Sequence, residues 1–157
     1  MFAQLWVPTY ALLSGMMADL IGYDPSSGMS GVLRNCYCAL FQSGSPAPSK
    51  GSTLVTQTEA DYDGYARQEV VWFPTYLDVL GPQAVTAANL QFRMTNTTTP
   101  NLITQIGLVS LVTGGVLLAC SELQTPVQFS ALTDQLTTAP VFQLTFNSIY
   151  GGPLVWA

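Results

Sequence analysis

The sequence predicts a mostly-β fold, an antiparallel β-sandwich or jelly roll with a short N-terminal helix. Turn residues recur about every ten residues between short β-branched and aromatic runs, as in sandwiches and barrels. A Gly114-Gly115 pair separates two such runs and indicates a hairpin. Strands do not alternate with helical segments, so a parallel α/β sheet is not expected. The 157 residues fit one domain. We expect an N-terminal arm over 1–22 and a single β-sandwich domain over 23–157.

The start of the chain carries apolar residues at loosely helical spacing. Proline is tolerated in the first turn of a helix and glycine often follows the last, so Pro8 and Gly22 are suitable boundaries. We therefore predict a helix from Thr9 to Leu20. The segment Gly22–Gly31 that follows is rich in Asp, Pro, Ser and Gly and is predicted to be a loop.

The remaining apolar runs are predicted to be strands, because they are bounded by Gly, Pro, Ser and Thr. Pro74 is expected to end one of them, since proline cannot donate a hydrogen bond within a sheet. The polar segments Ser43–Ser52 and Thr95–Pro100 are predicted to be loops. The predicted strands are Asn35–Gln42, Thr53–Thr58, Gln68–Phe73, Asn89–Met94, Ile103–Val112, Val116–Leu123, Val141–Phe146 and Tyr150–Trp156.

The strand predicted before the Gly-Gly turn is apolar on both faces. Ile106, Leu108 and Val112 alternate onto one face, and Val109 and Leu111 onto the other. An antiparallel strand that is dry on both sides lies in the middle of a sandwich or at a subunit contact.

The uncharged stretch Leu102–Cys120 approaches the length of a membrane span. Its central Gly pair, its Thr and Ser residues and the lack of an aromatic belt or flanking Lys and Arg favour the hairpin instead. We therefore expect no membrane partner.

The composition excludes several classes of function. Charged residues make up only 8% of the chain, against about 25% in ordinary soluble domains. Without histidine, Ser-His, Cys-His and zinc-histidine sites cannot be built. Arg34, Lys50, Arg67 and Arg93 are far apart in the sequence, so no basic cluster for nucleic acid is expected. No phosphate-binding glycine motif is present either. We predict no enzyme, no catalytic residue, no cofactor and no metal.

The three cysteines, Cys36, Cys38 and Cys120, are predicted to be reduced, buried thiols, with a disulfide from Cys120 to either of the others as the alternative. The N-terminal sequence lacks the basic start and apolar core of a signal peptide. The sequon Asn96-Thr97-Thr98 is accordingly interpreted as a polar loop.

An acidic cluster precedes Arg67. On an extended segment, Glu59, Asp61 and Asp63 alternate onto one face. The segment Asp61-Tyr62-Asp63-Gly64 resembles the start of a calcium-binding loop, but the later ligands are missing. A solvated or arginine-paired face is favoured over a cation site or a catalytic pair. Asp63 or Glu69 is the expected partner of Arg67.

Gly64 lies between Tyr62 and Tyr65, which predicts a bend with the two rings packed nearby. Such a corner has two interpretations that the residues leave open. It is either a purely structural turn or a lock between subunits, because Tyr and Arg are favoured at interfaces.

The layout of the chain resembles that of small virion proteins of tailed bacteriophages. The resemblance covers most of the chain in layout but is specific over only part of it, and it does not extend beyond Leu123. The matching features are an apolar N-terminal segment, a strand ending in Leu-Phe, a Pro-rich loop, an acidic-aromatic corner and two later aromatic strands. In this sequence they are Leu12–Leu20, Ala39-Leu40-Phe41, Ser45–Pro48, Glu59–Gln68, Trp72-Phe73-Pro74 and the strand around Phe92.

The resemblance implies a capsid decoration or cement protein of a phage head, made in the host cytoplasm and located on the capsid surface. Its partners would be its own copies, in a homotrimer, and the shell of the major capsid protein. An uncharged surface suits such a role, because neighbouring copies cover it. The candidate interface residues are Phe2, Leu5, Trp6, Tyr62, Tyr65, Arg67, Trp72 and Phe73.

Two alternatives remain. The first is a tail, neck or fibre component of the virion, which copy number per particle distinguishes. The second is a carbohydrate-binding β-sandwich module, in which Trp6, Trp72 and Trp156 would stack on sugars.

Overall fold

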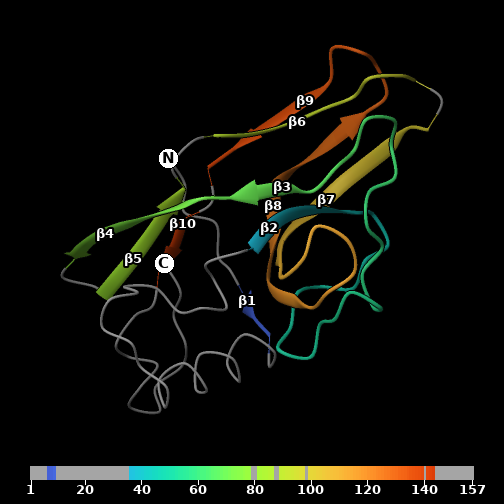
Figure 1. Cartoon of the computed structure of the whole chain (residues 1–157). Coiled ribbons are helices and arrows are strands. Elements are labelled where there is room, and N and C mark those ends of the chain that lie inside the picture. The colour runs from blue at the N-terminus through green and yellow to red at the C-terminus, as the bar shows by residue number, and fades with distance from the viewer. Residues whose placement is uncertain are drawn as a thin grey trace.

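A computed structural model describes residues 7–9, 36–78, 81–86, 89–97, 99–139 and 141–143 (Figure 1). Within these ranges the chain consists of strands and loops, and every strand pair is antiparallel. The predicted mostly-β, antiparallel class is therefore confirmed for the described part. No helix within these ranges is long and apolar enough to cross a membrane.

The strands form three sheets. The largest has five strands in the order β1-β8-β7-β2-β3, and the other two have the orders β10-β5-β4 and β6-β9. The five-stranded sheet contains β1 (Val7–Pro8), β8 (Leu117–Phe129), β7 (Asn101–Val109), β2 (Cys36–Gln42) and β3 (Gln68–Val70). The smaller sheets contain β10 (Val141–Gln143), β5 (Gly81–Thr86), β4 (Trp72–Asp78), β6 (Leu90–Arg93) and β9 (Gln135–Thr138).

The five-stranded sheet is buried on both faces at its centre. The alternation of β2 sends Cys38 and Leu40 into one hydrophobic cluster and Ala39 and Phe41 into another. The first cluster includes residues of the β6–β9 ribbon, such as Phe92. The prediction that the strand before the Gly-Gly turn is dry on both sides is thus confirmed for the part of it that lies in β7.

A glycine in β7 allows the second cluster to pack against the sheet. Gly107 lies opposite Ala39 on one side and Cys120 on the other. A Cβ atom on Gly107 would lie 2.4 Å from Cε2 of Phe41 and 3.0 Å from Cδ1 of Leu117. The fully buried Phe41 ring therefore occupies the space that a side chain at position 107 would need.

The predicted hairpin at the Gly-Gly pair is confirmed, but its loop is longer than expected. β7 ends at Val109 and β8 begins at Leu117. The Ser110 backbone N–H donates to the Val116 carbonyl oxygen at 3.0 Å and closes the loop. Gly114 and Gly115 have φ values of 64° and 83°, a conformation that favours glycine. The alternating faces predicted for positions 111 and 112 are wrong, because these residues belong to the loop.

Several predicted boundaries are wrong. The segment Thr53–Thr58 is a turn, stabilised by the Thr56 N–H donating to the Thr53 carbonyl at 3.1 Å. The predicted strand Gln68–Phe73 is divided at Val71, where the chain passes from the five-stranded sheet into β4 (Figure 1). Pro74 does not end a strand but lies within β4, which is an edge strand and tolerates the missing donor.

The described N-terminal residues give the predicted helix no support. Pro8 does not begin a helix but pairs with Ala119 in β1, and the Thr9 N–H donates to the Leu118 carbonyl at 2.8 Å. Proline fits this position because β1 is also an edge strand. The rest of the predicted helix and the strand predicted over Tyr150–Trp156 lie outside the described residues.

Candidate functional site

The acidic-aromatic corner is an excursion from the edge of the five-stranded sheet. Before it, the Gln42 N–H donates to the Thr58 carbonyl at 2.8 Å, and the Ala60 N–H donates to the Leu40 carbonyl at 2.9 Å. After it, Gln68–Val70 pairs with the beginning of β2. Residues 61–67 leave the sheet between these two pairings, so the two ends of the corner lie along the same strand.

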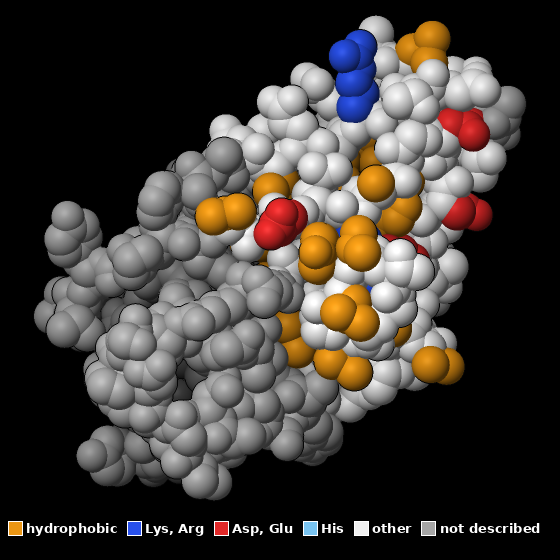
Figure 2. All heavy atoms as spheres, in the orientation of Figure 1, with side chains coloured by type: hydrophobic (Ala, Val, Ile, Leu, Met, Phe, Trp, Pro, Cys, Tyr) orange, Lys and Arg blue, Asp and Glu red, His pale blue; other side chains and the backbone are white. Residues whose placement is uncertain are grey.

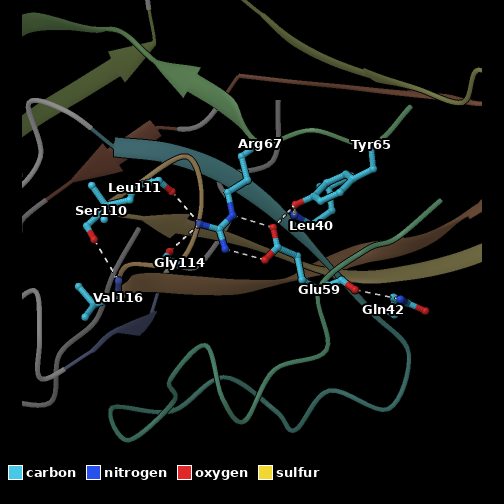
Figure 3. A network of polar contacts seen from close by, with 9 residues as sticks. All are labelled: Leu40, Gln42, Glu59, Tyr65, Arg67, Ser110, Leu111, Gly114 and Val116. Carbon is cyan, nitrogen blue, oxygen red and sulfur yellow. Dashed lines mark hydrogen bonds and ion pairs between the residues drawn. The ribbon is translucent and has the colours of Figure 1, made fainter. Parts of the chain in front are cut away.

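Arg67 closes the excursion (Figure 3). Its Nε donates to Oε1 of Glu59 at 2.7 Å, and its Nη2 donates to Oε2 at 2.6 Å. Nη1 reaches the β7–β8 loop and donates to the carbonyl oxygens of Leu111 and Gly114, each at 2.7 Å. The Arg67 side chain is 7% exposed and that of Glu59 is 29% exposed. The planar guanidinium thus joins the corner to the hairpin loop, and we call this arrangement the Arg67 clamp.

The sequence predicted the wrong acid as the partner of Arg67. Its ion pair is with Glu59, and not with Asp63 or Glu69 as expected. Asp63 lies in the turn of the corner, where its carbonyl accepts the Thr95 N–H at 2.8 Å, and Glu69 is exposed on β3. Sequence distance is misleading here, because the excursion brings its first and last residues back together.

Tyr65 completes the clamp. Its hydroxyl donates to Oε1 of Glu59 at 2.7 Å and accepts the backbone N–H of Leu40 at 3.2 Å. The Tyr62 ring packs edge-on against Tyr65 with the ring centroids 5.5 Å apart, and it stacks on Phe129 at 4.3 Å. The prediction that Tyr62 and Tyr65 pack together at a bend is confirmed.

The Glu59 carboxylate and the Arg67 guanidinium stabilise each other in their charged forms. Burial raises the pKa of Glu59, but the hydrogen bonds from Arg67 and Tyr65 and the Arg67 charge outweigh burial and hold it below its usual value. The hydrogen bond to Glu59 raises the pKa of Arg67. Burial, followed by the contact with Glu59, raises the pKa of the Tyr65 hydroxyl. The clamp is therefore an ion pair held by a neutral phenol, with no group poised to exchange a proton near neutral pH.

The stability that the clamp contributes should depend on pH. Because the pKa of Glu59 is lower in the folded chain than in the unfolded chain, its contribution is complete above the unfolded value of about 4.3. The contribution is then lost as the pH falls through the lower folded pKa. Urea unfolding at a series of pH values should show this loss, and Glu59→Gln should make the decline below pH 5 shallower. An equally steep decline in the variant would contradict the assignment.

The two tyrosine hydroxyls should differ in their effect on stability. Tyr65→Phe leaves the Leu40 N–H without its partner and is expected to cost about 1–2 kcal/mol. Tyr62→Phe is the matched control, because the buried Tyr62 hydroxyl has no hydrogen-bond partner among the described residues. Its removal should be neutral or slightly stabilising. Urea unfolding of both variants measures the difference, and equal losses would show that the Tyr65 hydroxyl is not held as described.

The acidic residues predicted to share one face, Glu59, Asp61 and Asp63, do not form one site. Glu59 is paired with arginine, in agreement with the favoured interpretation. Oδ1 of Asp61 accepts hydrogen bonds from the side-chain amides of Gln42 at 2.8 Å and Asn101 at 2.9 Å. In the described part of the chain, no three His, Cys, Asp or Glu residues are grouped as metal ligands would be. Cys38 and Cys120 are free, buried thiols, and burial raises the pKa of both.

The Arg67 clamp holds a loop with an apolar surface. Leu111 is 54%, Val112 is 58% and Val116 is 48% exposed. Figure 2 shows hydrophobic side chains gathered over the β7–β8 hairpin. We call these three residues the apolar tip. Sequence reasoning missed it by placing all three in strands, although their position beside the Gly-Gly pair was a signal that they belong to a loop.

The predicted interface residues have different places in the structure. Tyr62, Tyr65 and Arg67 are brought together in the corner, where Tyr62 is only 2% exposed. Trp72 and Phe73 begin β4 and pair with Thr86 and Val85 of β5, and their backbone alone is described. The other three, Phe2, Leu5 and Trp6, lie outside the described residues.

No protein-family model matches the chain, and no curated protein matches it in sequence.

Proposed function

We propose that this chain is a non-enzymatic structural protein of a virus particle, a decoration or cement protein that binds the outside of a phage head as a homotrimer. In this proposal its strands build a β-sandwich or jelly roll. The single observation that carries the proposal is the apolar tip, an exposed aliphatic surface held in place by the buried Arg67 clamp.

A rigid apolar tip is suited to binding protein. Because Arg67 already fixes the Leu111 and Gly114 carbonyls, little loop entropy is lost when the tip is covered. Burial of apolar area contributes about 25 cal/mol per Å². The stretch 102–120 carries no charge, so its burial incurs no cost of desolvating an ion.

The small size of the tip favours a repeated partner over a single one. Three aliphatic side chains cannot supply the roughly 800 Å² per partner that a standard stable interface buries. A symmetric shell offers many equivalent sites, and an oligomer that engages several of them gains avidity from contacts that are weak individually. A homotrimer on a capsid lattice satisfies this requirement.

The experiment compares two leucines of equal exposure. Leu111 in the tip is 54% exposed, and Leu132 in the β8–β9 loop is 53% exposed. Leu111→Gln is expected to weaken binding to stripped shells of the encoding virus about tenfold, because it forfeits roughly 1.4 kcal/mol of apolar burial per site. Leu132→Gln should bind as the unmodified chain does.

Binding is measured by sedimentation of purified protein with the shells, and urea unfolding verifies that both variants are folded. Equal binding by both variants would remove the tip from the interface. An unmodified chain that stays monomeric and never sediments with shells would overturn the proposed function itself.

A further inference from the structure

Two glutamines are buried where the 43–58 segment packs on the five-stranded sheet, on the face that carries Ala39 and Phe41. Gln57 is 6% and Gln105 is 3% exposed. Gln57 belongs to the turn that follows Thr53, and Gln105 belongs to β7, where it lies opposite Phe41. Glutamine is rarely buried, and its polar atoms normally have hydrogen-bond partners when it is.

The two side-chain amides converge on one carbonyl group. Nε2 of Gln105 donates to the Pro46 carbonyl oxygen at 2.9 Å and to that of Ser45 at 3.2 Å. Nε2 of Gln57 donates to the same Pro46 oxygen at 3.3 Å. The shared acceptor brings the two amide groups close together and fixes their orientation. Exchanging N and O in either amide would set its oxygen against the Pro46 oxygen.

The oxygen atoms of both amides are left without a partner. Oε1 of Gln57 and Oε1 of Gln105 are buried, and neither accepts a hydrogen bond from any described residue. A buried acceptor that is left unsatisfied costs about 1–3 kcal/mol. Two unsatisfied acceptors on amides that share one carbonyl group suit a ligand with two donors, and water is the smallest molecule that has them.

We propose that one ordered water molecule bridges Oε1 of Gln57 and Oε1 of Gln105 beneath the 43–58 segment. A metal ion fits this place less well, because the two amides are neutral and, among the described residues, no His, Cys, Asp or Glu cluster supplies charged ligands. The bridge would fasten to β7 a segment whose own outer residue, Val55, is 96% exposed. It would act independently of the Arg67 clamp, which fixes the other loop.

The test detects the residence time of the water by NMR. In isotope-labelled protein, the side-chain NH₂ groups of Gln57 and Gln105 should show cross-peaks to water with opposite signs in NOE and ROE spectra, the signature of long-lived solvent. Gln128 is the internal control, since its amide donates to the Asn101 carbonyl at 3.1 Å but the residue is exposed. Its water contacts should have the same sign in both spectra.

Variants separate a bridging water from unrelated solvent. Gln105→Met should abolish the long-lived water signal at Gln57, whereas Gln128→Met should leave it unchanged. A high-resolution crystal structure should place one density peak within hydrogen-bond distance of both oxygens. The proposal is overturned if both oxygens are dry, if the Gln57 signal survives Gln105→Met, or if the peak is a metal ion with short coordination distances. None of these outcomes bears on the role of the apolar tip.

Discussion

Replacing Arg67 with methionine is expected to destabilise the chain by about 3 kcal/mol, because it leaves a half-buried carboxylate without its counter-ion. The variant loses both hydrogen bonds to Glu59 and both to the hairpin loop. Methionine retains most of the apolar stem, so the loss reports the charge and its hydrogen bonds. Urea unfolding measures the change from the shift in midpoint at constant slope.

Arg93→Met is the matched control, since Arg93 is exposed on β6, and its change should stay within about 0.5 kcal/mol. Arg67→Lys should fall between wild type and Arg67→Met, because an ammonium group keeps the charge but cannot bind both Glu59 oxygens and the loop carbonyls together. In hydrogen exchange, the Ser110 N–H that closes the loop should lose protection in Arg67→Met. Equal stability of Arg67→Met and Arg93→Met would contradict the clamp.

Gly107→Ala is expected to destabilise the chain by about 2 kcal/mol through overpacking. The new methyl group would lie 2.4 Å from Cε2 of the fully buried Phe41, so the ring must move within a closed core. Gly51→Ala is the control, because a Cβ there meets nothing closer than the Ser49 hydroxyl at 3.9 Å. Thermal or urea unfolding of the two variants measures the contrast, and a neutral Gly107→Ala would refute the packing described for this face.

A second substitution tests whether the Phe41 ring is the cause of that loss. Phe41→Leu alone removes part of the ring and should destabilise the chain by leaving a cavity. Combined with Gly107→Ala, the two changes should cost less than the sum of their separate effects, since each relieves the other. Additive losses would indicate that some other contact opposes the alanine.

The parts of the fold that the sequence could predict are those with local signals. The apolar run predicts the strand Asn35–Gln42, and the structure has β2 over Cys36–Gln42. The hairpin followed from Gly114-Gly115, because two adjacent positive φ angles are readily reached only by glycine. The packing of Tyr62 on Tyr65 followed from their position on either side of a bend.

The rest depended on contacts that local patterns do not encode. β5 begins with Gly81-Pro82, which is typical of a turn, and β9 has a polar sequence, so neither strand was predicted. The position of Pro74 within a strand was missed, because proline is tolerated there only at the edge of a sheet. That β4 is an edge strand depends on the tertiary arrangement and cannot be read from the local sequence. The partner of Arg67 was missed because the excursion that returns Glu59 to it is visible only after folding.

In the proposed function, many copies of this chain cover the shell of a virus particle. The most direct test is its copy number in purified particles, measured by quantitative mass spectrometry against the major shell protein. We expect hundreds of copies, in a multiple of three, that stand in a fixed ratio to the shell protein. A count of about a dozen or fewer would place the chain in the tail, neck or fibres, and its absence from particles would show that it is not a virion protein.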